Sequence, residues 1–80
     1  MTKEEALEAL RSIFAEVLDE KDIELDYEMT ANDVDRWDSI TNMTIISEIE
    51  SKFNIKLKLR EIIKQKNVGT LCDTIVSKSK

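Results

Sequence analysis

Apolar residues recur at intervals of three and four along most of this chain, and that period limits its fold more than any other feature. Because 3.6 residues make one helical turn, such spacing gathers the apolar side chains on one face of a helix. Thr2 and Glu5 have the spacing of a capping box just ahead of the first series, so we predict a helix over residues 3–18. Its apolar positions are Ala6, Leu7, Leu10, Ile13, Phe14, Val17 and Leu18.

The second half of the chain repeats this pattern. Asp38 is a natural N-cap for a helix over residues 39–52, and Asn54 is a plausible stop. Asn67 is placed to cap a last helix, in whose first turn lies the only glycine, Gly69. With no proline and no low-complexity linker, the chain is predicted to be an all-α four-helix bundle with a short third helix. The apolar positions of these three helices are Ile40, Met43, Ile45, Ile46, Ile49 and Phe53, then Leu59, Ile62 and Ile63, then Val68, Leu71, Cys72 and Ile75.

Residues 19–37 lack a helical period. Ile23, Leu25, Tyr27 and Met29 alternate with polar residues, which fits either one half-buried strand or a loop. Because no second alternating run is convincing as a partner strand, we favour a long loop that lies over the bundle with these side chains turned inward. Long ordered loops in compact domains often have functional roles.

The composition excludes several classes of protein. Eighty residues are expected to form one domain, residues 1–80, with little room for a deep active site. Histidine is absent and Cys72 is the single cysteine, which excludes an intramolecular disulfide, a cysteine-rich metal site and Ser–His or Cys–His catalysis. We expect Cys72 to be a small buried core residue. The polar amino terminus and the lack of a long apolar run predict a cytoplasmic protein without a membrane segment.

The charge distribution argues against nucleic-acid and metal partners. Residues 1–40 contain thirteen acidic and four basic residues, whereas residues 41–80 contain four acidic and eight basic ones. The net charge of −5 disfavours binding to nucleic acid or anionic lipid, and the basic half lacks interleaved aromatic residues. The acidic runs that begin at Asp22 and at Asp33 have neither the glycine nor the final glutamate of a calcium loop. We therefore predict no metal site.

The tetrapeptide Trp37-Asp38-Ser39-Ile40 is the most specific local feature. It places a serine at the start of a helix, where such a residue often only caps the helix. The same position suits an attached phosphate, because a helix amino terminus offers N–H groups and a positive dipole end. We therefore expect N–H groups in this turn to be free for an anion. We expect Trp37 to be a packing anchor for the long loop rather than a binding residue.

The residues around Ser39 extend the pattern. Thr30-Ala31-Asn32-Asp33-Val34 precedes it, Thr41-Asn42 follows, and Phe53-Asn54-Ile55-Lys56-Leu57 and Lys66-Asn67-Val68-Gly69-Thr70-Leu71 lie downstream. In order, length and helix pattern the chain resembles acyl carrier proteins, in particular stand-alone members with a W-D-S-[LI]-T motif.

This resemblance implies a carrier rather than an enzyme. A phosphopantetheinyl transferase would attach 4′-phosphopantetheine from coenzyme A to Ser39. Asp38 would contact a basic residue of the transferase, and Ile40, half exposed, would offer it an apolar contact. The thiol of the arm, and not Cys72, would hold acyl groups as thioesters.

The resemblance also implies a partner surface on the second helix, formed by Met43, Thr44, Ser47, Glu48 and Glu50. Met43 and Ser47 share a face with Ser39, although Met43 could instead fill the core. Many fatty-acid carriers have more acidic residues on this helix. Thr44 and Lys52 occupy two positions where such carriers often have glutamate, which favours a dedicated set of partners in a specialised fatty-acid, polyketide or related pathway. The expected partners are an acyl-loading ligase, an acyltransferase or a ketosynthase, and the protein is expected to be a monomer.

Two alternatives share this sequence evidence. An aminoacyl or peptidyl carrier would have the same fold and the same serine. A helical protein–protein interaction module without a cofactor would have the fold alone. The residues themselves do not separate these possibilities, so a measurement of covalent modification is required.

Overall fold

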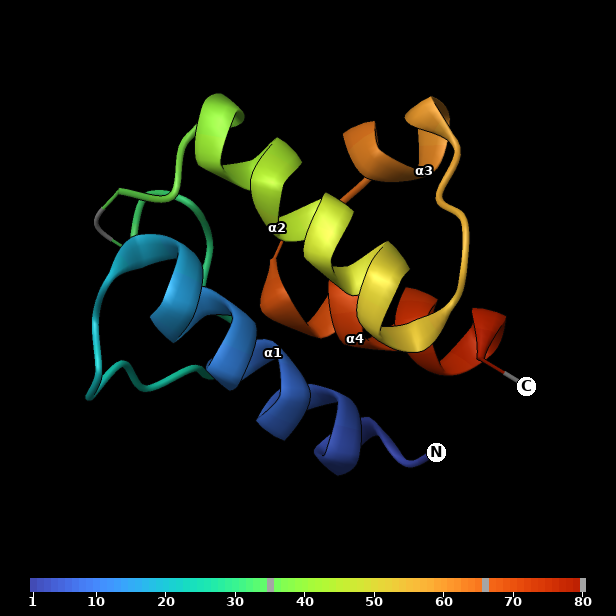
Figure 1. Cartoon of the computed structure of the whole chain (residues 1–80), viewed down its shortest axis with the longest axis horizontal. Helices are drawn as coiled ribbons and strands as arrows, with labels where there is room; N and C mark the ends of the chain where they lie inside the picture. The colour runs from blue at the N-terminus through green and yellow to red at the C-terminus, as the bar shows by residue number, and fades with distance from the viewer. Residues whose placement is uncertain (35, 66, 80) are drawn as a thin grey trace.

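Four helices form the chain in the computed structural model, which describes residues 1–34, 36–65 and 67–79. They are α1 (Lys3–Leu18), α2 (Ser39–Phe53), α3 (Leu59–Ile63) and α4 (Val68–Lys78), as Figure 1 shows. The prediction of an all-α fold with a short third helix and a long first loop is confirmed. The second helix ends one residue later than predicted. None of these helices has the length and hydrophobicity needed to cross a membrane within the described part of the chain.

The helix boundaries follow from local hydrogen bonds. Thr2 and Glu5 form the predicted capping box, with the Thr2 N–H donating to Glu5 Oε1 at 2.8 Å and the Glu5 N–H donating to Thr2 Oγ1 at 3.1 Å. α1 and α2 end where Asp19 and Asn54 adopt left-handed backbone angles, with φ of 56° and 55°. Asp and Asn tolerate this conformation better than most residues, which explains why both helices stop there.

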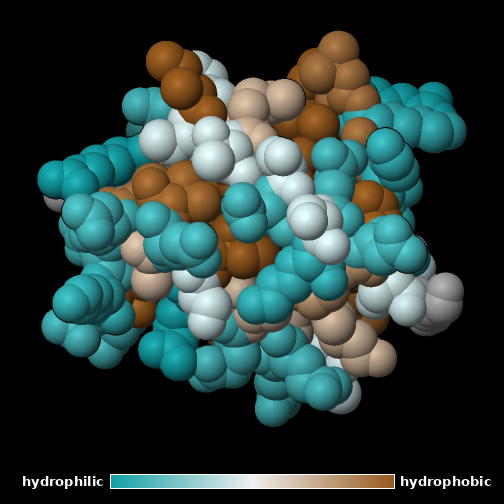
Figure 2. All heavy atoms as spheres, viewed as in Figure 1, coloured by the Kyte–Doolittle hydropathy of each residue, from teal (hydrophilic) through white to brown (hydrophobic). Residues whose placement is uncertain are grey.

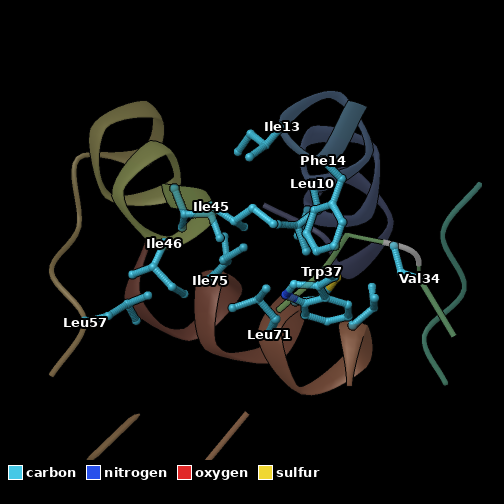
Figure 3. Close-up of a cluster of buried hydrophobic side chains, with 14 of the residues drawn as sticks. Leu10, Ile13, Phe14, Val34, Trp37, Ile45, Ile46, Leu57, Leu71 and Ile75 are labelled. Atoms are coloured by element: carbon cyan, nitrogen blue, oxygen red, sulfur yellow. The ribbon is translucent and has the colours of Figure 1, made fainter. Parts of the chain in front are cut away.

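The core lies where α1 packs against both α2 and α4. Figure 3 shows how side chains from these helices and from the long loop meet there. Phe14 of α1 contacts Trp37 edge-on, with ring centroids 4.9 Å apart, and Trp37 is only 8% exposed. Trp37 is therefore the packing anchor that we predicted, and Cys72 is fully buried as expected.

The long loop is attached to the start of α4 by its backbone. The Gly69 N–H donates to the Tyr27 carbonyl oxygen at 2.7 Å, and the Val68 N–H donates to the Met29 carbonyl oxygen at 2.9 Å. A Cβ atom on Gly69 would lie 2.9 Å from the Tyr27 carbonyl oxygen, so glycine permits this close approach. The four alternating apolar residues pack against the core, as predicted for a loop: Ile23, Leu25, Tyr27 and Met29.

The third helix differs from what its apolar residues suggested. Ile62 packs against the core, but Leu59 and Ile63 are 68% and 73% exposed. Glu61 joins α3 to α4 through an ion pair with Lys78, with Oε2 and Nζ 3.0 Å apart. α3 therefore presents apolar side chains to solvent instead of burying a continuous stripe.

Candidate functional site

The segment that leads into α2 forms a closed turn. The Asp33 carboxylate accepts hydrogen bonds from the Thr30 N–H at 3.0 Å and from the Thr30 hydroxyl at 3.2 Å. Val34, which follows, is buried in the core. The Thr30–Val34 part of the motif therefore shapes and anchors this turn. Asp35 and Lys66, which belong to the sequence patterns discussed above, lie outside the described residues.

Two side chains next to this turn connect it to the helices. Arg36 has a left-handed backbone, with φ of 69°, and its Nη1 donates to the Leu18 carbonyl oxygen at 3.1 Å. The Trp37 indole N–H donates to Asn42 Oδ1 in α2 at 2.9 Å. These contacts hold the start of α2 in place against the end of α1.

Asp38 is the N-cap of α2, as predicted. Its Oδ1 accepts hydrogen bonds from the N–H groups of Ile40 and Thr41, each at 2.9 Å, and its own N–H donates to Thr41 Oγ1 at 2.9 Å. The Thr41 N–H bond is the main reason why the pKa of the Asp38 carboxyl lies below its ordinary value. Asp38 is thus a stable anion beside Ser39 at neutral pH.

This capping arrangement corrects, for Ile40 and Thr41, the expectation that N–H groups of the first turn are free for a phosphate. The Ile40 and Thr41 N–H groups are already bound to the Asp38 carboxylate. The Asn42 N–H donates to the Asp38 carbonyl oxygen at 2.8 Å, as the first intrahelical bond. An anion attached at Ser39 still experiences the helix dipole, but it has to displace the cap to reach the amides of Ile40 and Thr41.

Ser39 is the first residue of α2, and its side chain is exposed. Within the described residues its hydroxyl makes no hydrogen bond. Ile40 is 78% exposed, more than the half exposure expected, and Met43 is 51% exposed, so filling of the core by Met43 is excluded. Figure 2 shows hydrophobic atoms at the surface over α2 and α3, where Ile40, Met43, Leu59 and Ile63 are exposed.

The other expected partner residues differ in their surroundings. Thr44, Ser47 and Glu48 are exposed on α2. Glu50 is only partly exposed, and its Oε2 accepts a hydrogen bond from the Leu57 N–H at 2.8 Å. Glu50 therefore holds the segment before α3 against α2, a structural role that sequence reasoning missed.

A cavity of about 200 Å³ opens beside Ser39. Gln65 is one of its lining residues, and the side-chain oxygen of Gln65 is buried and has no hydrogen-bond partner among the described residues. Sequence reasoning missed Gln65, which stands between two lysines in a segment that reads as solvent-exposed. The cavity is lined by Ala31, Trp37, Asp38, Ser39, Asn42 and Gln65.

A larger cavity, of about 400 Å³, lies in the acidic loop, away from Ser39. Its lining includes Glu20, Asp22, Glu24 and Asp33. Across residues 1–34, 36–65 and 67–79, no three histidine, cysteine or acidic side chains are grouped so that they could hold a metal ion. Burial raises the pKa of the Cys72 thiol to about 11, so this thiol is protonated at neutral pH.

Comparisons with known proteins find a family model and a solved structure that are similar to this chain. Residues 8–75 match the family model described as a phosphopantetheine attachment site. The fold is similar to the solution NMR structure of a holo acyl carrier protein from Geobacter metallireducens, with 44% identity and a TM-score of 0.85. That similarity covers 91% of this chain and 84% of the other. Among curated proteins no significant match is found.

Proposed function

The chain belongs to the phosphopantetheine-binding family of acyl carrier proteins, and we propose that Ser39 bears its 4′-phosphopantetheine arm. The observation that supports this most is the exposed Ser39 hydroxyl, which has no hydrogen bond within the described residues. The turn before it is held by Arg36, Trp37 and Asp38. A modifying enzyme thus meets an accessible nucleophile on a rigid support.

The proposed attachment chemistry needs no catalytic group from the carrier. The Ser39 oxygen attacks the phosphorus that bears pantetheine in coenzyme A, and a new O–P bond forms. The pyrophosphate P–O bond breaks, adenosine 3′,5′-bisphosphate leaves, and the serine proton passes to a base of the transferase. The carrier family is non-catalytic, so the protein is a substrate of this reaction. The arm then holds acyl groups as thioesters on its terminal thiol.

Asp38 and Ile40 are proposed to contact the transferase. All the capping bonds to the Asp38 carboxylate are made by Oδ1, which leaves Oδ2 without a partner among the described residues. A basic side chain of the enzyme can bind Oδ2 without disturbing the cap. The highly exposed Ile40 offers an apolar contact on the other side of Ser39.

The proposed docking surface for later partners comprises Met43, Thr44, Ser47, Glu48 and Glu50. The first four residues are exposed, which supports this surface. Glu50 contributes less, because its Oε2 already accepts a hydrogen bond from the Leu57 N–H. Glu48 is therefore the main acidic contact on α2, and a partner that needs many acidic residues would bind weakly. This composition supports dedicated partners in a specialised fatty-acid, polyketide or related pathway.

Residues 1–80 act as one carrier domain, supported by one core cluster that draws on α1, α2, α4 and the long loop. We expect a cytoplasmic monomer that meets a loading ligase, an acyltransferase or a ketosynthase. An aminoacyl or peptidyl carrier remains the second candidate, because the Ser39 site is equally suited to it. Loading assays with acyl and aminoacyl ligases separate the two.

Intact-mass measurement tests the attachment site. The purified protein is incubated with coenzyme A and a broad-specificity phosphopantetheinyl transferase. We expect the wild type and Ser47→Ala, a control at another exposed serine of α2, to gain one arm, and Ser39→Ala to gain none. An unmodified wild type would support the cofactor-free interaction module, and a modified Ser39→Ala would place the arm elsewhere.

A further inference from the structure

Four exposed cations surround the short third helix. Lys56 and Lys58 precede α3, Arg60 lies within it, and Lys64 directly follows it. None of the ion pairs within the described residues uses any of these four side chains. Their positive charges are therefore available to an anionic partner.

The acidic residue within α3 does not neutralise this charge. Residues 51–72 contain one acid, Glu61. Its Oε1 accepts a hydrogen bond from the Lys58 N–H at 2.9 Å, and its Oε2 pairs with Lys78 Nζ of α4 at 3.0 Å. Because both oxygens of Glu61 are occupied in this way, the outer surface of α3 keeps an unbalanced positive charge.

A row of two exposed apolar side chains lies beside these cations. Leu59 and Ile63 are about one helical turn apart, so they share a face of α3, and Arg60 and Lys64 form the next row around the helix. Ile62 lies on the inner side and packs against the core. In Figure 2, hydrophobic atoms over α3 lie next to hydrophilic ones. The outer surface of α3 therefore combines an apolar row with a basic row.

The exposed apolar residues of the described chain are grouped rather than scattered. All of the large ones except Met1 belong to α2 or α3: Ile40, Met43, Leu59 and Ile63. Single exposed apolar side chains are common on proteins, whereas a group of them bordered by polar residues is typical of a contact surface. The grouping therefore indicates a function for the apolar row of α3.

The third helix is held firmly against the fold although it is short. Gln65 Nε2 donates to the Glu61 carbonyl oxygen and to Thr74 Oγ1 of α4, each at 2.9 Å. Glu50 Oε2 of α2 accepts a hydrogen bond from the Leu57 N–H at 2.8 Å, just before α3. A partner that binds α3 therefore meets an ordered surface, which lowers the entropic cost of association.

We infer that this face of α3 is a docking surface for a partner protein whose own contact surface has an apolar pocket bordered by acidic residues. The apolar row enters the pocket, and the cations approach the acidic residues at its border, where complementary charge steers association. The α3 surface does not include Ser39, so the inference does not depend on the arm. The α3 surface consists of Lys56, Lys58, Leu59, Arg60, Ile63 and Lys64.

The same features disfavour a membrane or a nucleic acid as the occupant. Two apolar side chains on a helix of five residues are few for an amphipathic membrane helix, and the acidic first half of the chain is repelled by anionic lipid. The α3 surface has no aromatic residue on which bases could stack. An acidic protein surface is the occupant that matches both rows.

Photo-cross-linking in the protein's own cell tests the inference. Leu59→benzoylphenylalanine places a photo-reactive side chain on the α3 surface, and Ser12→benzoylphenylalanine places the same group on the exposed side of α1 as a control. Tandem mass spectrometry then identifies the partner segment that is joined to each position. We expect position 59, and not position 12, to capture a segment with net negative charge. A neutral or basic segment, or no partner specific to position 59, overturns the inference.

The captured protein, once purified, supplies a second readout. Its Kd for the apo carrier is measured at low and high salt for the wild type, Arg60→Gln, Lys64→Gln and the control Lys21→Gln, which removes one exposed positive charge from the long loop. We expect Arg60→Gln and Lys64→Gln each to weaken binding by about two- to fivefold at low salt and to reduce its salt dependence. Lys21→Gln should leave both unchanged. Equal Kd values in all four proteins exclude the cations as contacts.

Two further results would assign the α3 surface to another occupant and overturn the inference. One is a cross-link from position 59 to a second copy of this chain. The other is binding to vesicles of phosphatidylglycerol and phosphatidylcholine that is weakened in Arg60→Gln. The attachment test remains separate, because an unmodified mass overturns the role of Ser39 and leaves the binding result at α3 standing.

Discussion

Replacing the single glycine, Gly69, with alanine should destabilise the protein, although alanine has the higher helix propensity. Gly69 lies in the first turn of α4, where Gly→Ala would ordinarily stabilise a helix by up to about 1 kcal/mol. Here the added Cβ would lie 2.9 Å from the Tyr27 carbonyl oxygen and 3.2 Å from Tyr27 Cβ. Because the nearer atom belongs to the backbone, the loop itself has to move.

The size of the effect follows from two losses and one gain. Overpacking in a close contact costs about 1–3 kcal/mol. Displacing the Tyr27 carbonyl weakens its 2.7 Å hydrogen bond from the Gly69 N–H, which costs about 0.5–1.5 kcal/mol. Against these stands the gain of up to about 1 kcal/mol in helix propensity. Gly69→Ala should therefore lower the free energy of unfolding by about 0.5–4.5 kcal/mol.

Thermal denaturation of the apo protein measures this change. At roughly 4–8 °C per kcal/mol for a domain of this size, the Tm of Gly69→Ala should fall by at least about 2 °C. Ser77→Ala is the control, because Ser77 is exposed on the same helix and its replacement should leave Tm unchanged or slightly raised. An unchanged or higher Tm for Gly69→Ala would show that the loop does not require this close approach.

Three further predictions concern the solution behaviour of the protein. Backbone hydrogen bonds from Thr2 and Thr41 lower the pKa values of Glu5 and Asp38. The stability that these two carboxylates give the fold is complete above the ordinary carboxyl pKa and is lost as pH falls, so Tm should drop between about pH 5 and pH 3, and a constant Tm would contradict this. Added salt should raise Tm at neutral pH by screening the acidic first half of the chain, and a Tm independent of salt would refute that reasoning. Because burial raises the pKa of Cys72 to about 11, a thiol reagent at pH 8 should find no reactive thiol in the native apo protein and one in the holo protein, whereas two in the native holo protein would contradict the assignment.

The helices and their boundaries could be predicted because their causes are local. Capping residues such as Thr2, Asp38 and Asn67 act on backbone groups within three residues. The apolar period likewise identified the buried faces of α1, α2 and α4. The packing role of Trp37 followed from its size and from its place at the end of a long loop.

The features that escaped prediction depend on residues that are distant in the chain or compete locally. The bond between Glu50 and Leu57 requires the chain to turn back after α2. The unpaired oxygen of Gln65 results from contacts with Glu61 and Thr74 in two different helices. The amides of Ile40 and Thr41 are bound to Asp38, although the sequence predicts free amides at the start of α2. A preference for a capping residue does not reveal how many of these groups its carboxylate binds.

The position of the arm on the protein from its own cell is the most direct test. The carrier is isolated without reducing or alkaline steps, cleaved with a protease, and analysed by tandem mass spectrometry. We predict 4′-phosphopantetheine, with or without a thioester-linked acyl group, on the peptide that contains Ser39. An arm located on another residue, or a Ser39 peptide that is never modified, would contradict the role assigned to this serine.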